Sequence, residues 1–221
     1  SGNVDNLLLT GLNVSMPTVI DIHSQVSLQN VTDSVGLGAD LMWDITTSDL
    51  SCLNRYLGLT DVRFPRMVLH ADTKLREASK LTADALLQEG KGRVHLKGSL
   101  DLQSMAYQAS TKIASLQLHD FLPKDSLYLL TANAKFSGRG TDVLSPGTRL
   151  QAFLDIEHLG YASWDLDNIH VDGKLDKGRL LAEMSSMNDL LGLQGCVDGV
   201  IGDRKLQATA FNVDISHIDL Y

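Results

Sequence analysis

The chain has 221 residues, of which 43% are hydrophobic and 21% charged, a balance typical of a folded protein and not of a disordered one. Its formal net charge of −8 argues against non-specific binding to nucleic acid or to an anionic membrane surface, because both need a positive field. Aromatic residues make up only 5%, so we expect a thin or open interior of Leu, Val, Ile and Ala.

Two alternating runs near the N-terminus predict β-strands. Residues 16–28 place Ile20, Ile22, Val26 and Leu28 on one side. Residues 35–45 carry an apolar side chain at every odd position: Val35, Leu37, Ala39, Leu41, Trp43 and Ile45. Successive side chains leave a strand on opposite faces, so each run predicts one apolar and one polar face. Residues 36–41 begin like a dinucleotide fingerprint but lack its third Gly, and we predict no cofactor there.

Helical patterns are few. Residues 48–58 predict one short amphipathic helix with Ser48 as its N-cap and Gly58 at its end, and mark a boundary near 46–62 within a single all-β region covering 1–221. Asp125 is a candidate cap for a second helix, although a strand beginning at Leu127 is an equal alternative.

The C-terminal half continues the alternation in residues 93–102, 149–157, 169–175, 179–184 and 207–217, with Phe153 interrupting a polar face. Turn signals separate the runs at residues 30–33, 89–92, 137–140, 145–147, 172–173, 176–178 and 202–203. Short connections imply antiparallel neighbours. The predicted fold class is all-β, an antiparallel meander of ten or more strands in an elongated, curled, gutter-like sheet with an apolar concave face and one or two short helices. Either this sheet folds over on itself or something outside the chain covers its apolar face.

No catalytic set emerges, so we expect no enzyme, no cofactor and no metal site. Four histidines fall on the polar sides of alternating runs without metal-ligand spacing: His23, His70, His95 and His170. Asp165, Asp167, Asp172 and Asp176 resemble a calcium loop, but Ile169 stands where an oxygen ligand is needed. We interpret these carboxylates as solvated.

Cys52 and Cys196 are expected to be free thiols and not a disulfide pair. Basic residues near strand ends, such as Lys135 and Arg139, are interpreted as solubilising groups that protect strand edges, with contact to lipid phosphates as the alternative.

Residues 119–143, together with 90–118, resemble the AsmA-like superfamily and in particular its TamB-type members. The resemblance depends on Gly90-Lys-Gly92, Gly98-x-Leu-Asp101, the strand at Tyr107, Phe121-Leu-Pro123 and Gly138-x-Gly140, and residues 166–186 have the same strand-turn-strand texture. It covers about the C-terminal three fifths well, and the first 60 residues only in texture.

The resemblance implies a segment of a long periplasmic protein, anchored in the inner membrane of a Gram-negative envelope outside these residues. It also implies a role in outer-membrane assembly and phospholipid transport, with an outer-membrane barrel protein as partner. We therefore expect phospholipid acyl chains to bind a hydrophobic groove formed by the apolar face.

The candidate groove residues are Leu37, Leu41, Trp43, Leu96, Leu154, Ile156, Ile169, Val171, Leu180, Met184, Phe211 and Val213. Two alternatives stay open. One is a closed structural β-sandwich or spacer, and the other is an adhesin-type binding module, for which only Tyr107 and Phe153 are candidate exposed aromatics on the polar face.

Overall fold

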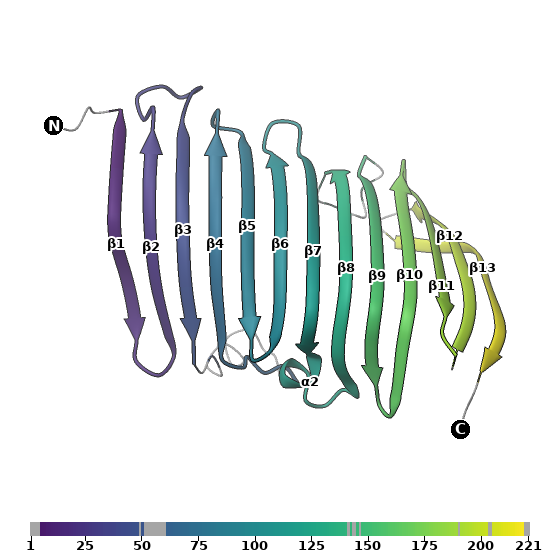
Figure 1. Cartoon of the computed structure of the whole chain (residues 1–221). Coiled ribbons are helices and arrows are strands. Elements are labelled where there is room, and N and C mark those ends of the chain that lie inside the picture. The colour runs from purple at the N-terminus through teal and green to yellow at the C-terminus, as the bar shows by residue number, and fades with distance from the viewer. Residues whose placement is uncertain are drawn as a thin grey trace.

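The computed structural model describes residues 5–48, 50, 61–140, 142, 145, 147–189, 191–202 and 205–218. These residues form one sheet of thirteen strands in which each strand pairs only with its neighbours in sequence (Figure 1). The strands are β1 (Asn6–Met16), β2 (Ile20–Gln29), β3 (Gly38–Thr47), β4 (Met67–Arg76), β5 (Lys80–Glu89), β6 (Gly92–Asp101), β7 (Ala106–Gln117), β8 (Leu127–Arg139), β9 (Arg149–Tyr161), β10 (Trp164–Asp176), β11 (Arg179–Met187), β12 (Leu191–Gly202) and β13 (Lys205–Ile218). The all-β antiparallel meander is thus confirmed.

Within the described ranges, the one helix is α2 (Leu118–Phe121), a single turn after β7 that the sequence did not predict. At the second predicted helix, strand β8 begins at Leu127, so the strand alternative is correct. The predicted helix at 48–58 lies almost entirely outside the described residues. On either side of it β3 and β4 pair directly, for example Trp43 with Ala71, so the sheet continues across the expected boundary.

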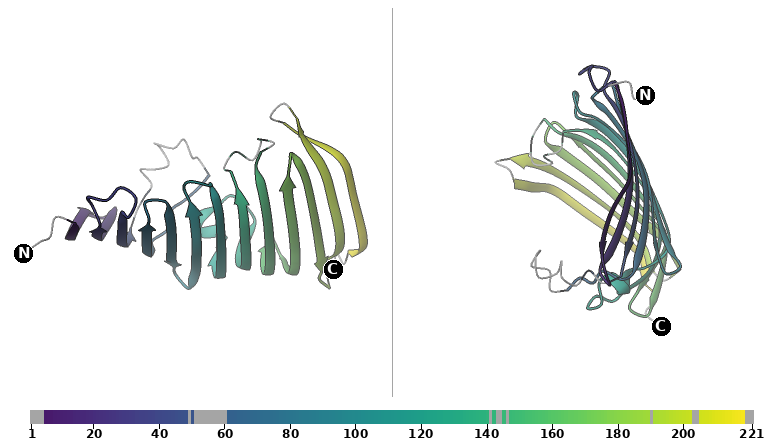
Figure 2. Two further views of the ribbon diagram at one scale, coloured as in Figure 1. Left: turned by 90° about the horizontal axis from the view of Figure 1, so that it is seen from above. Right: turned by 90° about the vertical axis from the view of Figure 1, so that its left-hand side faces the viewer.

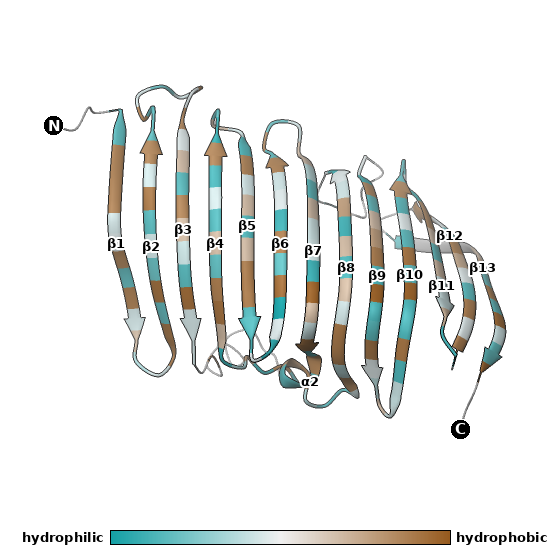
Figure 3. Cartoon of the chain, viewed as in Figure 1, coloured by the Kyte–Doolittle hydropathy of each residue, from teal (hydrophilic) through white to brown (hydrophobic). Residues whose placement is uncertain are grey.

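Alternation gives the sheet an apolar face and a polar face. In β5, for example, Leu81, Ala83, Ala85 and Leu87 are half-buried on one face, and the residues between them are exposed on the other. Since partners across a ladder point the same way, the register carries this division from strand to strand. Figure 3 shows it as alternating hydrophilic and hydrophobic bands along the strands.

The sheet curls, with β12 and β13 turning out of the plane of the first strands (Figure 2). Along strands such as β5, the residues of the apolar face are half-buried and those of the polar face are exposed. The total accessible surface is 14,320 Å², against about 10,000 Å² for a compact monomer of 24.1 kDa. Only Ala39, Leu116, Ala132, Ala134 and Leu175 are buried apolar residues in the described part. Most of the apolar face therefore lacks a protein layer among these residues.

Several local expectations need correction. Strand β3 begins at Gly38, so Leu37 lies in the preceding loop, where its carbonyl accepts a hydrogen bond from the N–H of Ala78. Asp172 and Gly173 lie inside β10 and do not form a turn. Tyr107 belongs to the apolar face, since it pairs with Leu100 and Gly138. The described strands form a single layer, which differs from the closed two-layer sandwich.

Candidate functional site

Large aliphatic side chains form a continuous row across the apolar face, which we call the leucine row. Its members occupy matching register positions from β4 to β11: Leu75, Leu81, Leu100, Tyr107, Gly138, Leu150, Leu175 and Leu180. Gly138 is the one small member, and the ring of Tyr107 covers it. A Cβ atom on Gly138 would lie 2.7 Å from the Tyr107 hydroxyl oxygen. The row is therefore unbroken.

Beside the leucine row lies a row of mostly small residues, which forms the floor of a trough. This small-residue row consists of Thr73, Ala83, Gly98, Ala109, Phe136, Ala152, Gly173 and Ala182. Phe136, with 38% of its surface exposed, is the one large member. Leu41 precedes this row in β3, and Val197 and Phe211 continue it in β12 and β13.

The next row completes the trough. This mixed row contains Trp43, Ala71, Ala85, Leu96, Thr111, Ala134, Leu154, Val171, Met184, Gly195 and Val213. Over β9 to β11 its large members form the second wall. Over β4 to β7 it is mostly small, and the wall moves one row outward to Leu69, Leu87, Val94 and Ile113.

The trough crosses the strands and follows the long axis of the sheet. From β4 to β11 there are seven steps between strands, so its length is about 34 Å at the usual strand spacing. The leucine row and the mixed row are four residues apart, which corresponds to about 13 Å along a strand. A path of these dimensions, lined by hydrocarbon, fits one extended hydrocarbon chain along its narrow part.

Eleven of the twelve predicted groove residues lie on the apolar face, and Leu37 alone precedes its strand. Six share the mixed row: Trp43, Leu96, Leu154, Val171, Met184 and Val213. Leu41 and Phe211 lie at the two ends of the small-residue row, and Leu180 belongs to the leucine row. Ile156 and Ile169 pair with each other one row further outward, in line with Ile113. That these residues contact lipid stays a prediction.

The small residues of the floor were missed because sequence reasoning selected large apolar side chains. Ala83, Gly98 and Ala109 carry little hydrophobic signal individually. Their alignment follows from the register of neighbouring strands, which the sequence does not state. One sequence signal for the floor was available. In several alternating runs, Ala or Gly stands near the middle at a position where the pattern would otherwise place Leu.

A buried carboxyl group lies on the apolar side at the end of β5. Glu89 is 7% exposed, and its Oε2 atom has no hydrogen-bond partner among the described groups. Burial raises the pKa of Glu89 above its usual range, and repulsion from Asp120 of α2 raises this pKa further. The burial of Glu89 and the nearby Asp120 together favour the protonated form of the Glu89 carboxyl group at this rim of the apolar face.

The polar face carries a different kind of row. Four of the seven histidines share one register line: His23, His70, His95 and His170. Each of these histidines has an oxygen partner on a neighbouring strand. A ring nitrogen of His23 lies 2.8 Å from Asn13 Oδ1, and a ring nitrogen of His70 lies 2.6 Å from Asp44 Oδ1. A ring nitrogen of His95 lies 2.6 Å from Asp84 Oδ1, and His170 contacts Asp155. The hydrogen bond to Asp44 raises the pKa of His70, and the one from His95 lowers the pKa of Asp84. This histidine row is satisfied by its own neighbours.

Other polar groups of the sequence analysis are also accounted for. Asp167 lies 2.7 Å from a ring nitrogen of His158, and Asp176 lies 3.0 Å from the guanidinium of Arg149. No group of three or more His, Cys, Asp or Glu residues suited to a metal ion occurs in the described part of the chain. Cys196 is a free, exposed cysteine, whereas Cys52 lies outside the described residues.

The comparisons with known proteins add no relative. Among the described residues, no helix combines the length and the hydropathy needed to cross a bilayer. No family model, no curated protein and no solved structure matches this chain. The resemblance to AsmA-like and TamB-type proteins stays a prediction.

Proposed function

We propose that the chain binds acyl chains of phospholipids along the trough, as a non-catalytic segment of an AsmA-like, TamB-type protein that serves lipid transport and outer-membrane assembly. The supporting observation is an apolar face that crosses the sheet and lacks a covering layer over most of its extent among the described residues. An exposed apolar area of this extent is unfavourable in water, and ordinary monomers avoid it.

The energetics favour a hydrocarbon occupant. Removing one methylene group from water contributes about 0.8 kcal/mol, so an acyl chain needs an apolar path along its whole length to leave a bilayer. The trough is about as long as the hydrocarbon core of a bilayer is thick, roughly 30 Å, which matches the summed length of two acyl chains. Polar residues on the opposite face keep such a carrier soluble.

The cellular setting belongs to the same proposal. A periplasmic location, an inner-membrane anchor in the longer chain and an outer-membrane barrel protein as partner follow from the family resemblance. The acidic net charge agrees with a carrier that does not adhere to anionic lipid surfaces and contacts lipid through its apolar face.

The test is native mass spectrometry with lipid extraction on protein purified from a bacterial envelope without detergent. We expect co-purifying phospholipid in the wild-type protein. Ala83→Phe fills the floor of the trough between Thr73 and Gly98 and should abolish that adduct. The matched control is Leu86→Phe in the same strand, which places its ring on the polar face and should retain the lipid.

The opposite result is equally clear. A folded wild-type protein that is empty after purification, and that takes up no lipid from phosphatidylethanolamine and phosphatidylglycerol vesicles, would overturn the proposal. Loss of lipid in both variants would show that the trough is not the path.

A further inference from the structure

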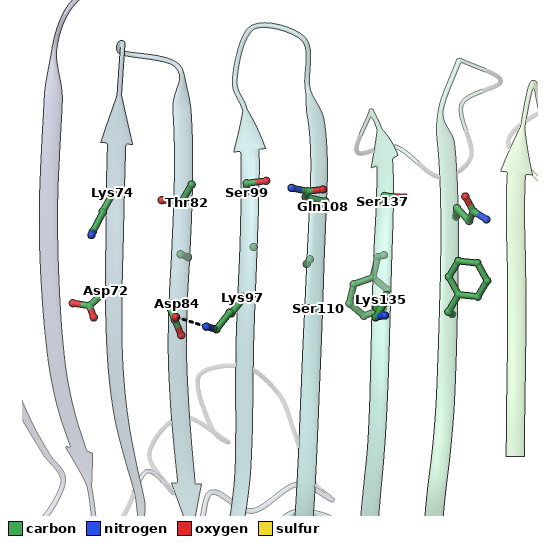
Figure 4. A pocket seen from close by; sticks show the side chains of 16 residues that line it. Asp72, Lys74, Thr82, Asp84, Lys97, Ser99, Gln108, Ser110, Lys135 and Ser137 are labelled. Atoms are coloured by element: carbon green, nitrogen blue, oxygen red, sulfur yellow. Dashed lines mark ion pairs between the residues drawn. The ribbon is translucent and has the colours of Figure 1, made fainter. Parts of the chain in front are cut away.

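The polar face has a depression of about 690 Å³ over β4 to β9 (Figure 4). Two adjacent polar-face rows line it, together with Ala83, Gly98, Ala109 and Phe136 of the small-residue row between them. One row contains Lys74, Thr82, Ser99, Gln108, Ser137 and Gln151, and the other contains Asp72, Asp84, Lys97, Ser110, Lys135 and Phe153. Its volume lies within the range of small-molecule and oligomer sites.

The side chains of this depression differ from those of the adjacent histidine row in their hydrogen bonding. In the histidine row each histidine has a partner on the protein. In the depression, the side chains of six uncharged residues make no hydrogen bond to any described residue: Thr82, Ser99, Gln108, Ser110, Ser137 and Gln151. Their hydroxyl and amide groups follow one another across five strands, β5 to β9, at steps of about 4.8 Å. They offer an outside ligand a continuous line of donors and acceptors.

Charge in the depression is mixed. Lys97 Nζ lies 3.1 Å from Asp84 Oδ2, and Asp84 also receives the hydrogen bond of His95. Lys74 and Lys135 have no carboxylate partner among the described residues. In a chain of net charge −8, two such lysines in an interior part of the sheet are better explained by an anionic ligand than by protection of an edge.

Phe153 supplies an apolar platform at one end. It is directly opposite Lys135 on β8, faces the polar side and is 44% exposed. The exposed part of such a ring suits the face of C–H bonds that a sugar ring presents. Lysines that bind carboxylates, aspartates that accept hydroxyl hydrogens and a ring for stacking match one class of ligand.

We infer that the depression binds an acidic oligosaccharide, a chain of sugars bearing carboxylate groups. A nucleic acid fits less well, because Asp72 and Asp84 would repel a continuous phosphate backbone whereas they accept hydrogen bonds from sugar hydroxyls. The inference does not depend on lipid binding, since the charged, polar and aromatic groups it uses are side chains of the polar face.

The test is isothermal titration calorimetry of the whole chain with a defined galacturonate hexamer, and with a neutral maltohexaose of equal length. We expect binding of the acidic hexamer only, and each of Phe153→Ala and Lys135→Ala should weaken it at least about fivefold. Lys112→Ala is the matched control, because Lys112 is an exposed lysine of the neighbouring histidine row and its removal should change affinity little.

Three results would overturn the inference. The first is no heat with either sugar from a folded protein, and the second is equal binding of both sugars. The third is an equal loss with Lys112→Ala and Lys135→Ala together with no effect of Phe153→Ala, which indicates non-specific attraction. Ala182→Phe fills the same small-residue row in β11, away from the lining of the depression, and should retain sugar binding, so that failure of lipid binding and failure of sugar binding are separable.

Discussion

The two faces of the sheet handle their side chains in opposite ways. On the polar face, the histidine row is satisfied within the protein by partners one strand away. On the apolar face, many large side chains of the described residues stay substantially exposed. The polar face thus satisfies part of its own side chains, whereas the apolar face stays open over most of its described extent.

This contrast shows where the stability of the chain originates. Backbone ladders between thirteen strands replace the thick core that a protein of this size normally has. A substitution should therefore lower the free energy of unfolding strongly only where the side chain is buried within the single layer, and should change it little elsewhere.

The largest effect is expected where the leucine row is tightest. A methyl group on Gly138 would collide with the backbone oxygen of Arg149 and with the Tyr107 ring, so Gly138→Ala should lower the free energy of unfolding by about 2–3 kcal/mol. Urea denaturation measures it. Gly173→Ala is the control, since its nearest contact, the oxygen of Ala152, is 3.9 Å away and the change should be neutral or slightly stabilising. Equal losses of unfolding free energy in the two variants would contradict tight packing around Gly138.

Replacing one leucine on each face compares directly how much the packing of the two faces contributes to stability. Leu175 on the apolar face is 4% exposed, and Leu175→Ala should cost about 2 kcal/mol. Leu181 on the polar face is 41% exposed, and Leu181→Ala should change the free energy of unfolding by less than about 0.5 kcal/mol. Similar values for both variants in the same denaturation assay would show that the two faces are equally closed.

A smaller effect is expected at the rim of the apolar face. Because the pKa of Glu89 is raised in the folded protein, stability should be greatest when this carboxyl is protonated and should fall as pH rises from its ordinary value of 4.5 through the raised value. Glu89→Gln removes this loss, and we expect its melting temperature to exceed that of the wild type by about 2–4 °C at pH 7 and to match it near pH 4. Parallel melting curves of wild type and variant across pH would refute a titrating Glu89.

The smallest effect concerns the histidine row. The carboxylate of Asp44 raises the pKa of His70, so the stability contributed by this pair is present below the ordinary histidine value of 6.5 and is lost as pH rises through the folded pKa. Both side chains are about half exposed, and the contribution should be only a few tenths of a kcal/mol. An NMR titration should give His70 a pKa above 6.5 that falls in Asp44→Asn, whereas an unchanged titration would rule out the pairing.

Much of the fold follows from the sequence because alternation reports directly on a strand with two unlike faces. The strand over residues 20–28 and the polar-face position of Phe153 were predicted in this way, although Met16 of the predicted run ends β1 and residues 17–19 form a turn. Turns were harder. Glu77 and Ala78 form the tight connection between β4 and β5 at positive φ without any glycine, and Gly173 lies inside a strand although glycine usually signals a turn.

The candidate site was only partly predictable for a related reason. Large residues such as Trp43 and Leu154 identify the apolar face one strand at a time. The trough depends on how Ala83, Gly98 and Ala109 align across three strands, and the depression depends on the alignment of Lys135 with Phe153. Register is set by turn lengths and bulges, such as the shift between Ile113 and Leu116, which a single sequence does not display.

The strictly sequential pairing of the strands makes the sheet close to a one-dimensional assembly, in which each described strand pairs only with the strands before and after it. Stability is then a sum over adjacent interfaces, and amide hydrogen exchange should be slowest in the centre and accelerate towards β1 and β13. Removing or inserting two adjacent strands shortens or lengthens the trough by about 10 Å and requires no rearrangement elsewhere. The number of strands in such a sheet therefore sets the length of its trough.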